Sequence, residues 1–163
     1  MKLTLDSFGL YDDFSVWALS SDIPLTRLCY FLNNSHQIRL CRSKKDIFIS
    51  KPESTFVSFN YHCPKTELQW FLTANHSSTQ SEKSASTEVQ NITHNLFADN
   101  NARSYPLIPV LKHYDAFLWI YGDMSSRELE KVNETLKAHS YLKTFRQLDL
   151  SATKKIENLI THV

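Results

Sequence analysis

The chain has 163 residues, of which 42% are hydrophobic and 12% aromatic, which is enough for one hydrophobic core. The 18 Lys and Arg residues are balanced by 17 Asp and Glu residues, so the formal charge of +1 gives no support to nucleic-acid binding by the chain as a whole. A mean hydropathy of −0.35 and the lack of an apolar run of about 18 residues argue against a membrane span.

The first residues of the sequence and the number of cysteines both bear on where in the cell the protein is expected to be. The segment Met1–Asp6 lacks the apolar stretch of a secretory signal. The three cysteines, Cys29, Cys41 and Cys63, are widely spaced, and an odd number cannot close completely into internal disulfides. We therefore expect a cytoplasmic protein, with residues 1–163 forming a single domain.

The N-terminal third predicts two strands and a helix. Lys2–Asp6 alternates polar and apolar residues, as in a short strand, and Phe14–Ser20 is rich in strand-forming side chains. The sequence Asp22–Pro24 is typical of a helix start, and Asn33–Ser35 is expected to end that helix. Four residues form its apolar face at helical spacing: Leu25, Leu28, Cys29 and Leu32.

Four more strands are expected in the middle of the chain. Gln37–Arg42 and Asp46–Ser50 flank a polar turn and predict a hairpin with each other. Thr55–Cys63 and Leu68–Ala74 both alternate apolar with polar residues. Such alternation is typical of an antiparallel sheet with one face in water.

The composition changes to Ser, Thr, Gln, Glu and Ala after residue 75, and we expect a flexible loop over about residues 75–105. Ala116–Tyr121 is apolar on both faces and predicts a central buried strand. Ser125 and Glu128 form the pattern of a helix-capping box. The remaining expected elements are that helix to about His139, a strand over Tyr141–Leu148 and a short helix or turn over Lys154–Thr161.

Together these elements predict an α+β fold: a mixed, mostly antiparallel sheet with two main helices. The chain has only two glycines, which excludes the glycine-rich loops that cradle phosphates. The only adjacent Cys and His are His62 and Cys63, which lack the paired spacing of a zinc site. We accordingly expect no catalytic residue, no metal site and no cofactor.

One polar candidate site precedes the central strand. His113 and Asp115 lie at a loop-to-strand junction, where a carboxylate can polarise a histidine. Tyr114 between them completes a binding candidate. The hypothesis that follows is a small-ligand binder or an enzyme that uses His113 and Asp115, although both also read as ordinary strand-entry residues.

A basic stretch offers a second candidate site, formed by Arg39, Arg42, Lys44 and Lys45. These side chains are suited to an RNA backbone, and nearby aromatic residues to stacking on a base. A solvated turn with lysines that block edge pairing explains the same pattern. The aromatic residues in question are Tyr30, Phe31 and Phe48.

Several segments resemble a known family. Arg27–Asn34, followed by Ile38–Leu40 and Arg42, resembles the N-terminal signature of the IPExxxVDY family, an uncharacterised group of Bacteroidetes proteins. Leu142–Phe145 and Lys155–Ile160 resemble the end of that family. The resemblance spans nearly the whole chain and is interrupted by the Ser/Thr-rich loop.

The motif that names the family falls on Ile108–Ala116 with its spacing kept, and Ile108, Pro109 and Asp115 match it. Three positions depart from it: Val110 replaces Glu, Tyr114 replaces Val and Ala116 replaces Tyr. The resemblance implies a cytoplasmic bacterial protein with no assigned activity, and it supplies no catalytic residue.

The leading hypothesis is therefore a non-enzymatic module that binds an unidentified protein partner, because aromatic residues are favoured at interfaces. Exposure of Tyr114, Trp119 or Tyr121 would support it. An RNA- or ribosome-associated factor is the second hypothesis, and the small-ligand binder or enzyme is the third. The sequence leaves the oligomeric state open.

Overall fold

The computed structural model describes residues 14–50, 53–77 and 104–149. The strand expected over Lys2–Asp6 and the helix or turn expected over Lys154–Thr161 lie outside the described residues. The same holds for residues 78–103, which make up most of the expected 75–105 loop.

Six strands form the main sheet in the order β2-β5-β6-β7-β1-β8, and every pairing between them is antiparallel. The central strand β7 lies between β6 and β1, as its doubly apolar sequence predicts. The strands are β1 (Phe14–Ser21), β2 (Cys41–Arg42), β5 (Ser58–His62), β6 (Gln69–Ala74), β7 (Ala116–Tyr121) and β8 (Leu142–Gln147).

The other elements are a two-stranded sheet of β3 (Ile47–Ser50) and β4 (Glu53–Phe56), the helices α1 (Leu25–His36) and α2 (Ser126–Ala138), and the 3-10 turn η1 (Pro109–Leu111). This arrangement confirms the predicted α+β fold class with two helices and a mostly antiparallel sheet. Within the described ranges, neither helix has the length and apolar character needed to cross a bilayer.

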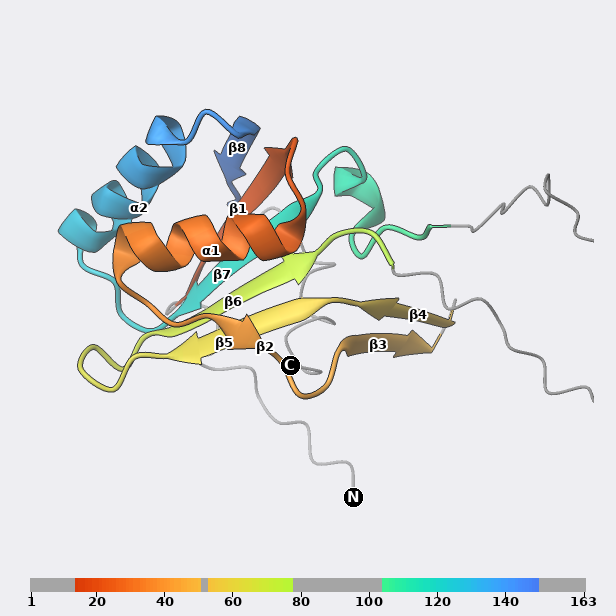
Figure 1. Cartoon of the computed structure of the whole chain (residues 1–163), viewed down its shortest axis with the longest axis horizontal. Helices are drawn as coiled ribbons and strands as arrows, with labels where there is room; N and C mark the ends of the chain where they lie inside the picture. The colour runs from red at the N-terminus through yellow and green to blue at the C-terminus, as the bar shows by residue number, and fades with distance from the viewer. Residues whose placement is uncertain (1–13, 51–52, 78–103, 150–163) are drawn as a thin grey trace, which may run out of the picture.

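Both helices cover the same face of the main sheet (Figure 1). Leu28 and Leu32 of α1 and Val132 and Leu136 of α2 are buried against side chains from the sheet. The sheet residues in this cluster alternate along their strands, because successive side chains of a strand point to opposite faces. They include Trp17, Leu19, Phe59, Trp70, Leu72, Leu118 and Ile120.

The opposite face of the sheet is also covered, so the expectation of one face in water is wrong. Phe117 and Trp119 of β7 are buried there together with Val16 and Ala18 of β1. These four side chains pack against residues of the small sheet and of the segment before β7. The alternation of apolar and polar residues along one strand cannot predict such covering residues, because they are distant in the sequence. The covering residues are Ile47, Phe56, Leu107, Ile108 and Tyr114.

The expected hairpin between Gln37–Arg42 and Asp46–Ser50 does not form. β2 pairs with β5, and β3 pairs with β4. The physical reason lies in α1, whose Asn33 side chain accepts a 2.8 Å hydrogen bond from the Leu40 backbone N–H and donates one of 3.1 Å to the Leu40 carbonyl. The residues before β2 are thereby bound to the helix rather than to a neighbouring strand.

The strand expected over Thr55–Cys63 is divided in two. β4 ends at Phe56 and β5 begins at Ser58, and the Val57 carbonyl accepts a 2.9 Å hydrogen bond from the Ala74 backbone N–H. Phe56 is buried on the face away from the helices, whereas Phe59 is buried on the helix side. The chain leaves one sheet and enters the other at Val57, which allows it to cover both faces.

The capping box predicted for α2 is confirmed. The Glu128 backbone N–H donates to Ser125 Oγ at 3.3 Å, and the Ser125 backbone N–H donates to the Glu128 carboxylate at 2.9 Å. These bonds satisfy N–H groups that the first turn of a helix leaves unpaired. The predicted extent of α2, to about His139, agrees with its end at Ala138.

Candidate functional site

A fully buried asparagine holds the segment that leads into β7. The Asn75 side-chain amide donates to the carbonyls of Leu111 at 2.9 Å and Tyr114 at 2.7 Å, and its side-chain oxygen accepts from the Ile108 N–H at 3.1 Å. Its backbone N–H donates to the Asp115 carbonyl at 2.8 Å. Asn75 therefore fixes the path of the chain into β7. The sequence pattern predicted instead that Asn75 begins a flexible loop.

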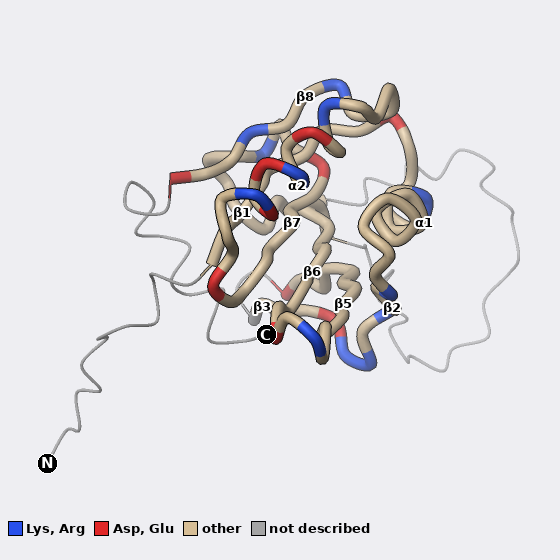
Figure 2. Tube along the Cα trace, turned by 90° about the vertical axis from the view of Figure 1, so that its left-hand side faces the viewer, with Lys and Arg blue, Asp and Glu red and all other residues tan. Residues whose placement is uncertain are grey.

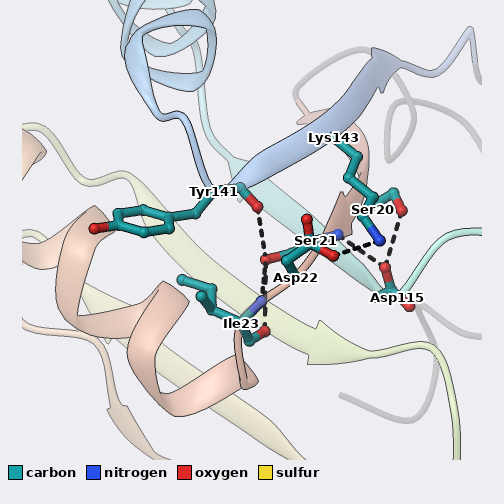
Figure 3. Close-up of polar contacts among 7 residues, drawn as sticks. All are labelled: Ser20, Ser21, Asp22, Ile23, Asp115, Tyr141 and Lys143. Carbon is teal, nitrogen blue, oxygen red and sulfur yellow. Dashed lines mark hydrogen bonds and ion pairs between the residues drawn. The ribbon is translucent and has the colours of Figure 1, made fainter.

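Asp115 is engaged with the end of β1 (Figure 3). One carboxylate oxygen accepts hydrogen bonds from the Ser20 hydroxyl at 3.0 Å and from the Ser21 backbone N–H at 2.8 Å. The pairing of β1 with β8 shifts register between these two serines. The carboxylate thus satisfies a backbone N–H at an irregularity in the strand. Asp115 has a structural role at this position.

Two residues of the first candidate site, His113 and Tyr114, lie together, while the third, Asp115, is bound to the end of β1. Tyr114 is buried, and the exposed His113 ring packs against it with 4.3 Å between the ring centroids. Within the described ranges His113 makes no hydrogen bond to Asp115, whose carboxylate is bound to β1. This arrangement does not bring a histidine and a carboxylate together for acid–base chemistry.

The second candidate site is partly neutralised. Arg42 forms a two-point ion pair with Asp46 and also donates to the Ser58 carbonyl at 3.1 Å. The hydrogen bond from Arg42 lowers the pKa of the Asp46 carboxyl. The other three basic side chains, Arg39, Lys44 and Lys45, are exposed.

The aromatic residues proposed to accompany that basic stretch are divided between two places. Phe48 is 57% exposed and belongs to β3, which follows α1 and β2 in the sequence. Phe31 of α1 instead contacts Tyr141, which directly precedes β8. Since β2 and β8 are opposite edges of the main sheet, Phe31 is directed toward the edge away from the basic stretch.

Five residues around that contact form a continuous surface, which we call the aromatic patch: Arg27, Tyr30, Phe31, His139 and Tyr141. Phe31 and Tyr141 stack with 4.9 Å between ring centroids and 18° between ring planes. Tyr30 meets Phe31 edge to face at 5.8 Å, and the Arg27 guanidinium lies 5.8 Å from the centroid of the Tyr141 ring. Tyr30 is 62% exposed and Tyr141 38% exposed.

Backbone contacts fix Tyr141 in this position. Its carbonyl accepts a 3.2 Å hydrogen bond from the Asp22 N–H and a 3.3 Å bond from the Ser21 hydroxyl. Figure 3 shows its ring reaching from the start of β8 toward α1. The end of β1, the start of α1 and the start of β8 thus hold one aromatic ring against another.

The sequence did not reveal the patch. The apolar periodicity of α1 identifies the buried Leu28 and Leu32, and it leaves Arg27, Tyr30 and Phe31 off that face. Two adjacent aromatic residues outside the apolar stripe were the available signal. Their pairing with Tyr141, more than a hundred residues away, depends on the tertiary structure. The residues whose exposure was expected to mark an interface, Tyr114 and Trp119, are buried, and Tyr121 is partly buried.

The last residue of α1, His36, lies against β6 and near charged groups of α2. The His36 ring packs on Trp70 at 5.2 Å between centroids, and its Nε2 is buried without a hydrogen-bond partner. Burial, assisted by the charges of Lys131 and His139, lowers the pKa of His36 to about 4. His139 in turn makes a 3.0 Å hydrogen bond to the Ser35 hydroxyl.

The cysteines have contrasting environments. Burial raises the pKa of the Cys29 thiol to about 11. Hydrogen bonds from the Thr66 hydroxyl and from the backbone of Lys65 and Thr66 lower the pKa of Cys63. All three cysteines are free. In the described part of the chain, no group of three metal-binding side chains comes together.

The fold and the patch define an antiparallel α+β protein with both helices on one face and an exposed aromatic cluster at one edge. Comparison with family models, curated proteins and solved structures gives no match to this chain. The resemblance to the IPExxxVDY family stays a prediction.

Proposed function

We propose that this protein is a non-enzymatic interaction module that binds a protein partner through the aromatic patch. The carrying observation is the stacked pair of Phe31 and Tyr141 beside Tyr30, whose ring is 62% exposed. Tyrosine and arginine are enriched among the residues that dominate binding energy at interfaces. The proposal includes the cytoplasmic setting expected from the odd number of cysteines.

The geometry of the patch favours binding because its side chains already contact one another. Phe31 is held between Tyr141 on one side and Tyr30 on another, and Arg27 lies near the Tyr141 ring. A side chain that is ordered before binding loses less conformational entropy when a partner covers it. Apolar ring surface, with one guanidinium at its border, suits a protein surface that offers apolar and acidic groups.

The test is co-purification of a tagged full chain from native lysate, followed by cross-linking and mass spectrometry. We expect one stoichiometric partner whose cross-links fall near α1 and the start of β8. The double variant Tyr30→Ser and Tyr141→Ser is expected to lose that partner. The matched control is Phe48→Ser, which removes a ring that is 57% exposed on β3 and should keep it. Equal retention by both variants would contradict the proposal.

A second function is kept for the basic stretch. Arg39, Lys44 and Lys45 are exposed, and Phe48 follows them with an exposed ring. This combination is suited to a single-stranded RNA, which presents phosphates and unstacked bases. Reversal of charge at Lys44 and Lys45 is then expected to weaken RNA binding and to reduce its salt dependence. An unchanged salt dependence would remove this alternative.

A further inference from the structure

We propose that the partner of the aromatic patch includes an acidic, extended segment that adds as a new strand to the outer edge of β8, the edge that faces away from β1. This inference rests on the proposed function, since it names the chemistry of the partner that the patch would bind. β8 begins one residue after Tyr141, so an added strand would run beside the patch. Among the described strands, β8 has a neighbour on one side only, which is β1.

The pairing pattern identifies which backbone groups face outward. The Leu148 N–H donates to the Val16 carbonyl at 2.9 Å, and Arg146 lies opposite Ala18 in the same ladder. Inward and outward groups alternate along an antiparallel edge strand. The N–H and C=O groups of Phe145 and Gln147 consequently point away from β1. They are available to the backbone of an added strand, which is the main source of affinity in strand addition.

The charge of β8 selects the kind of segment. Between Leu142 and Leu148 the charged side chains are Lys143 and Arg146, both exposed, and no acidic residue occurs. In Figure 2, blue segments of the tube mark Lys and Arg positions in the region of β8. Lys143 is paired with Asp22, but an exposed ion pair of this kind contributes little to stability. An acidic strand is therefore favoured over a neutral or basic one.

The same charges argue against a second copy of this chain as the occupant. An antiparallel pairing of β8 with itself that brings the outward groups of Phe145 opposite those of Gln147 would be centred on Arg146, and would place Arg146 opposite Arg146 of the other copy. Like charges directly opposite each other destabilise a strand pair. Lysine on an edge strand discourages such self-association while leaving the edge open to a strand of opposite charge.

The other edge of the sheet is a poorer site for strand addition. β2 consists of Cys41 and Arg42, which is too short for an extended ladder. Arg42 makes a two-point ion pair with Asp46 and also donates to the Ser58 carbonyl, so its guanidinium is already engaged on three sides. β8 has six residues and two basic side chains, so both its length and its charge favour it as the docking edge.

The first experiment uses a fluorescein-labelled short peptide that alternates glutamate with valine and ends in tryptophan, measured by anisotropy against the full chain. The reversal Lys143→Glu with Arg146→Glu is expected to weaken binding by about tenfold or more. The matched control is Lys44→Glu with Lys45→Glu, which makes the same change of charge at the opposite edge and should leave the affinity unchanged. Equal weakening by the two reversals, or no binding by the unaltered protein, overturns the proposal.

The second experiment tests the backbone directly. Gln147→Pro removes one outward N–H and places a ring on the edge, where proline is tolerated in a strand. It is expected to abolish binding of the peptide, whereas Gln147→Ala should keep it. In the unaltered protein, the peptide should slow hydrogen exchange at the amides of Phe145 and Gln147. Unchanged exchange at both amides overturns the proposal even if the proline variant is poorly folded.

These outcomes separate this inference from the proposed function. One outcome is that the natural partner is lost by the Tyr30→Ser and Tyr141→Ser variant but retained by Gln147→Pro. That outcome would support the aromatic patch as a binding surface and would overturn strand addition. A homodimer in light scattering that Gln147→Pro dissociates would assign β8 to self-association and would also overturn the acidic segment as occupant.

Discussion

Asn75 and Tyr114, 39 residues apart, are joined by a 2.7 Å hydrogen bond from the Asn75 carboxamide to the Tyr114 carbonyl. The same carboxamide also bonds Leu111 and Ile108, so one side chain satisfies three backbone groups of the segment before β7. This segment covers the second face of the sheet. The bonds of Asn75, which directly follows β6, therefore attach the end of β6 to the residues that bury that face.

Replacement of Asn75 should be strongly destabilising. Asn75→Ala leaves buried backbone groups without partners, and we expect the free energy of unfolding to fall by about 2–4 kcal/mol. Urea denaturation measures this change. Asn60→Ala is the matched control, because Asn60 is exposed on β5 and should lose less than about 0.5 kcal/mol. Similar losses in the two variants would show that the Asn75 bonds contribute little.

His36 should make the protein sensitive to acid. Its pKa is about 4 in the folded protein, against 6.5 for an ordinary histidine, so the unfolded chain binds the proton more tightly. Stability is therefore complete above pH 6.5, falls as the pH is lowered toward 4, and changes no further below that value through this residue. With allowance for partial exposure, the loss is about 2 kcal/mol.

The measurement for His36 is the free energy of unfolding between pH 8 and pH 4, compared with His36→Gln. The variant should lose less stability across this range, because glutamine does not titrate. Asn34→Gln serves as control, since Asn34 is an exposed residue of the same helix that does not titrate, and its replacement should leave the pH dependence as it is. Parallel curves for the unaltered protein and His36→Gln would contradict the prediction.

The capping box should contribute measurably to α2. Ser125→Ala removes the hydroxyl that accepts the Glu128 N–H, and we expect a loss of about 1 kcal/mol in the free energy of unfolding. Ser126→Ala changes the neighbouring exposed serine, which is the first residue of the helix, and should have little effect. Thermal or urea unfolding distinguishes the two, and equal losses would argue against the cap.

The cysteines should differ in their reactivity. Cys63 has a lowered pKa and should react with a thiol reagent before Cys29, which is buried and has a pKa raised to about 11. Thr66→Val removes the hydroxyl that stabilises the Cys63 thiolate and should slow its labelling at neutral pH. Peptide mass spectrometry after brief alkylation identifies the modified residue. Labelling of Cys29 first would contradict the structure around α1.

The local sequence determined much of the fold, because helix and strand patterns depend on neighbouring residues. The apolar spacing of Leu28 and Leu32 predicted α1, the Ser125 and Glu128 pair predicted the start of α2, and the doubly apolar Ala116–Tyr121 predicted the central strand. Each of these signals acts within a few residues of chain, so no tertiary information is needed to interpret it.

Strand pairing could not be predicted in the same way. The chain between Gln37 and Ser50 has the pattern of a hairpin, yet the Asn33 side chain binds Leu40 and leads the chain to β5. Residues 107–114 contain little periodicity, yet the bonds of Asn75 hold them over the second face of the sheet, beside Ile47 and Phe56. Partners of this kind are far apart in sequence, and alternation specifies a face but not the element that covers it.

The aromatic patch, too, was predictable from the sequence only in part. The sequence alone determined which side chains are basic or aromatic and that α1 would bury Leu28 and Leu32. Only the tertiary structure decided that Phe31 would meet Tyr141, because that contact depends on the pairing of β8 with β1 and on the packing of both helices on one face. Short-range periodicity is encoded in neighbouring residues, whereas a surface formed by distant segments exists only when the sheet between them has assembled.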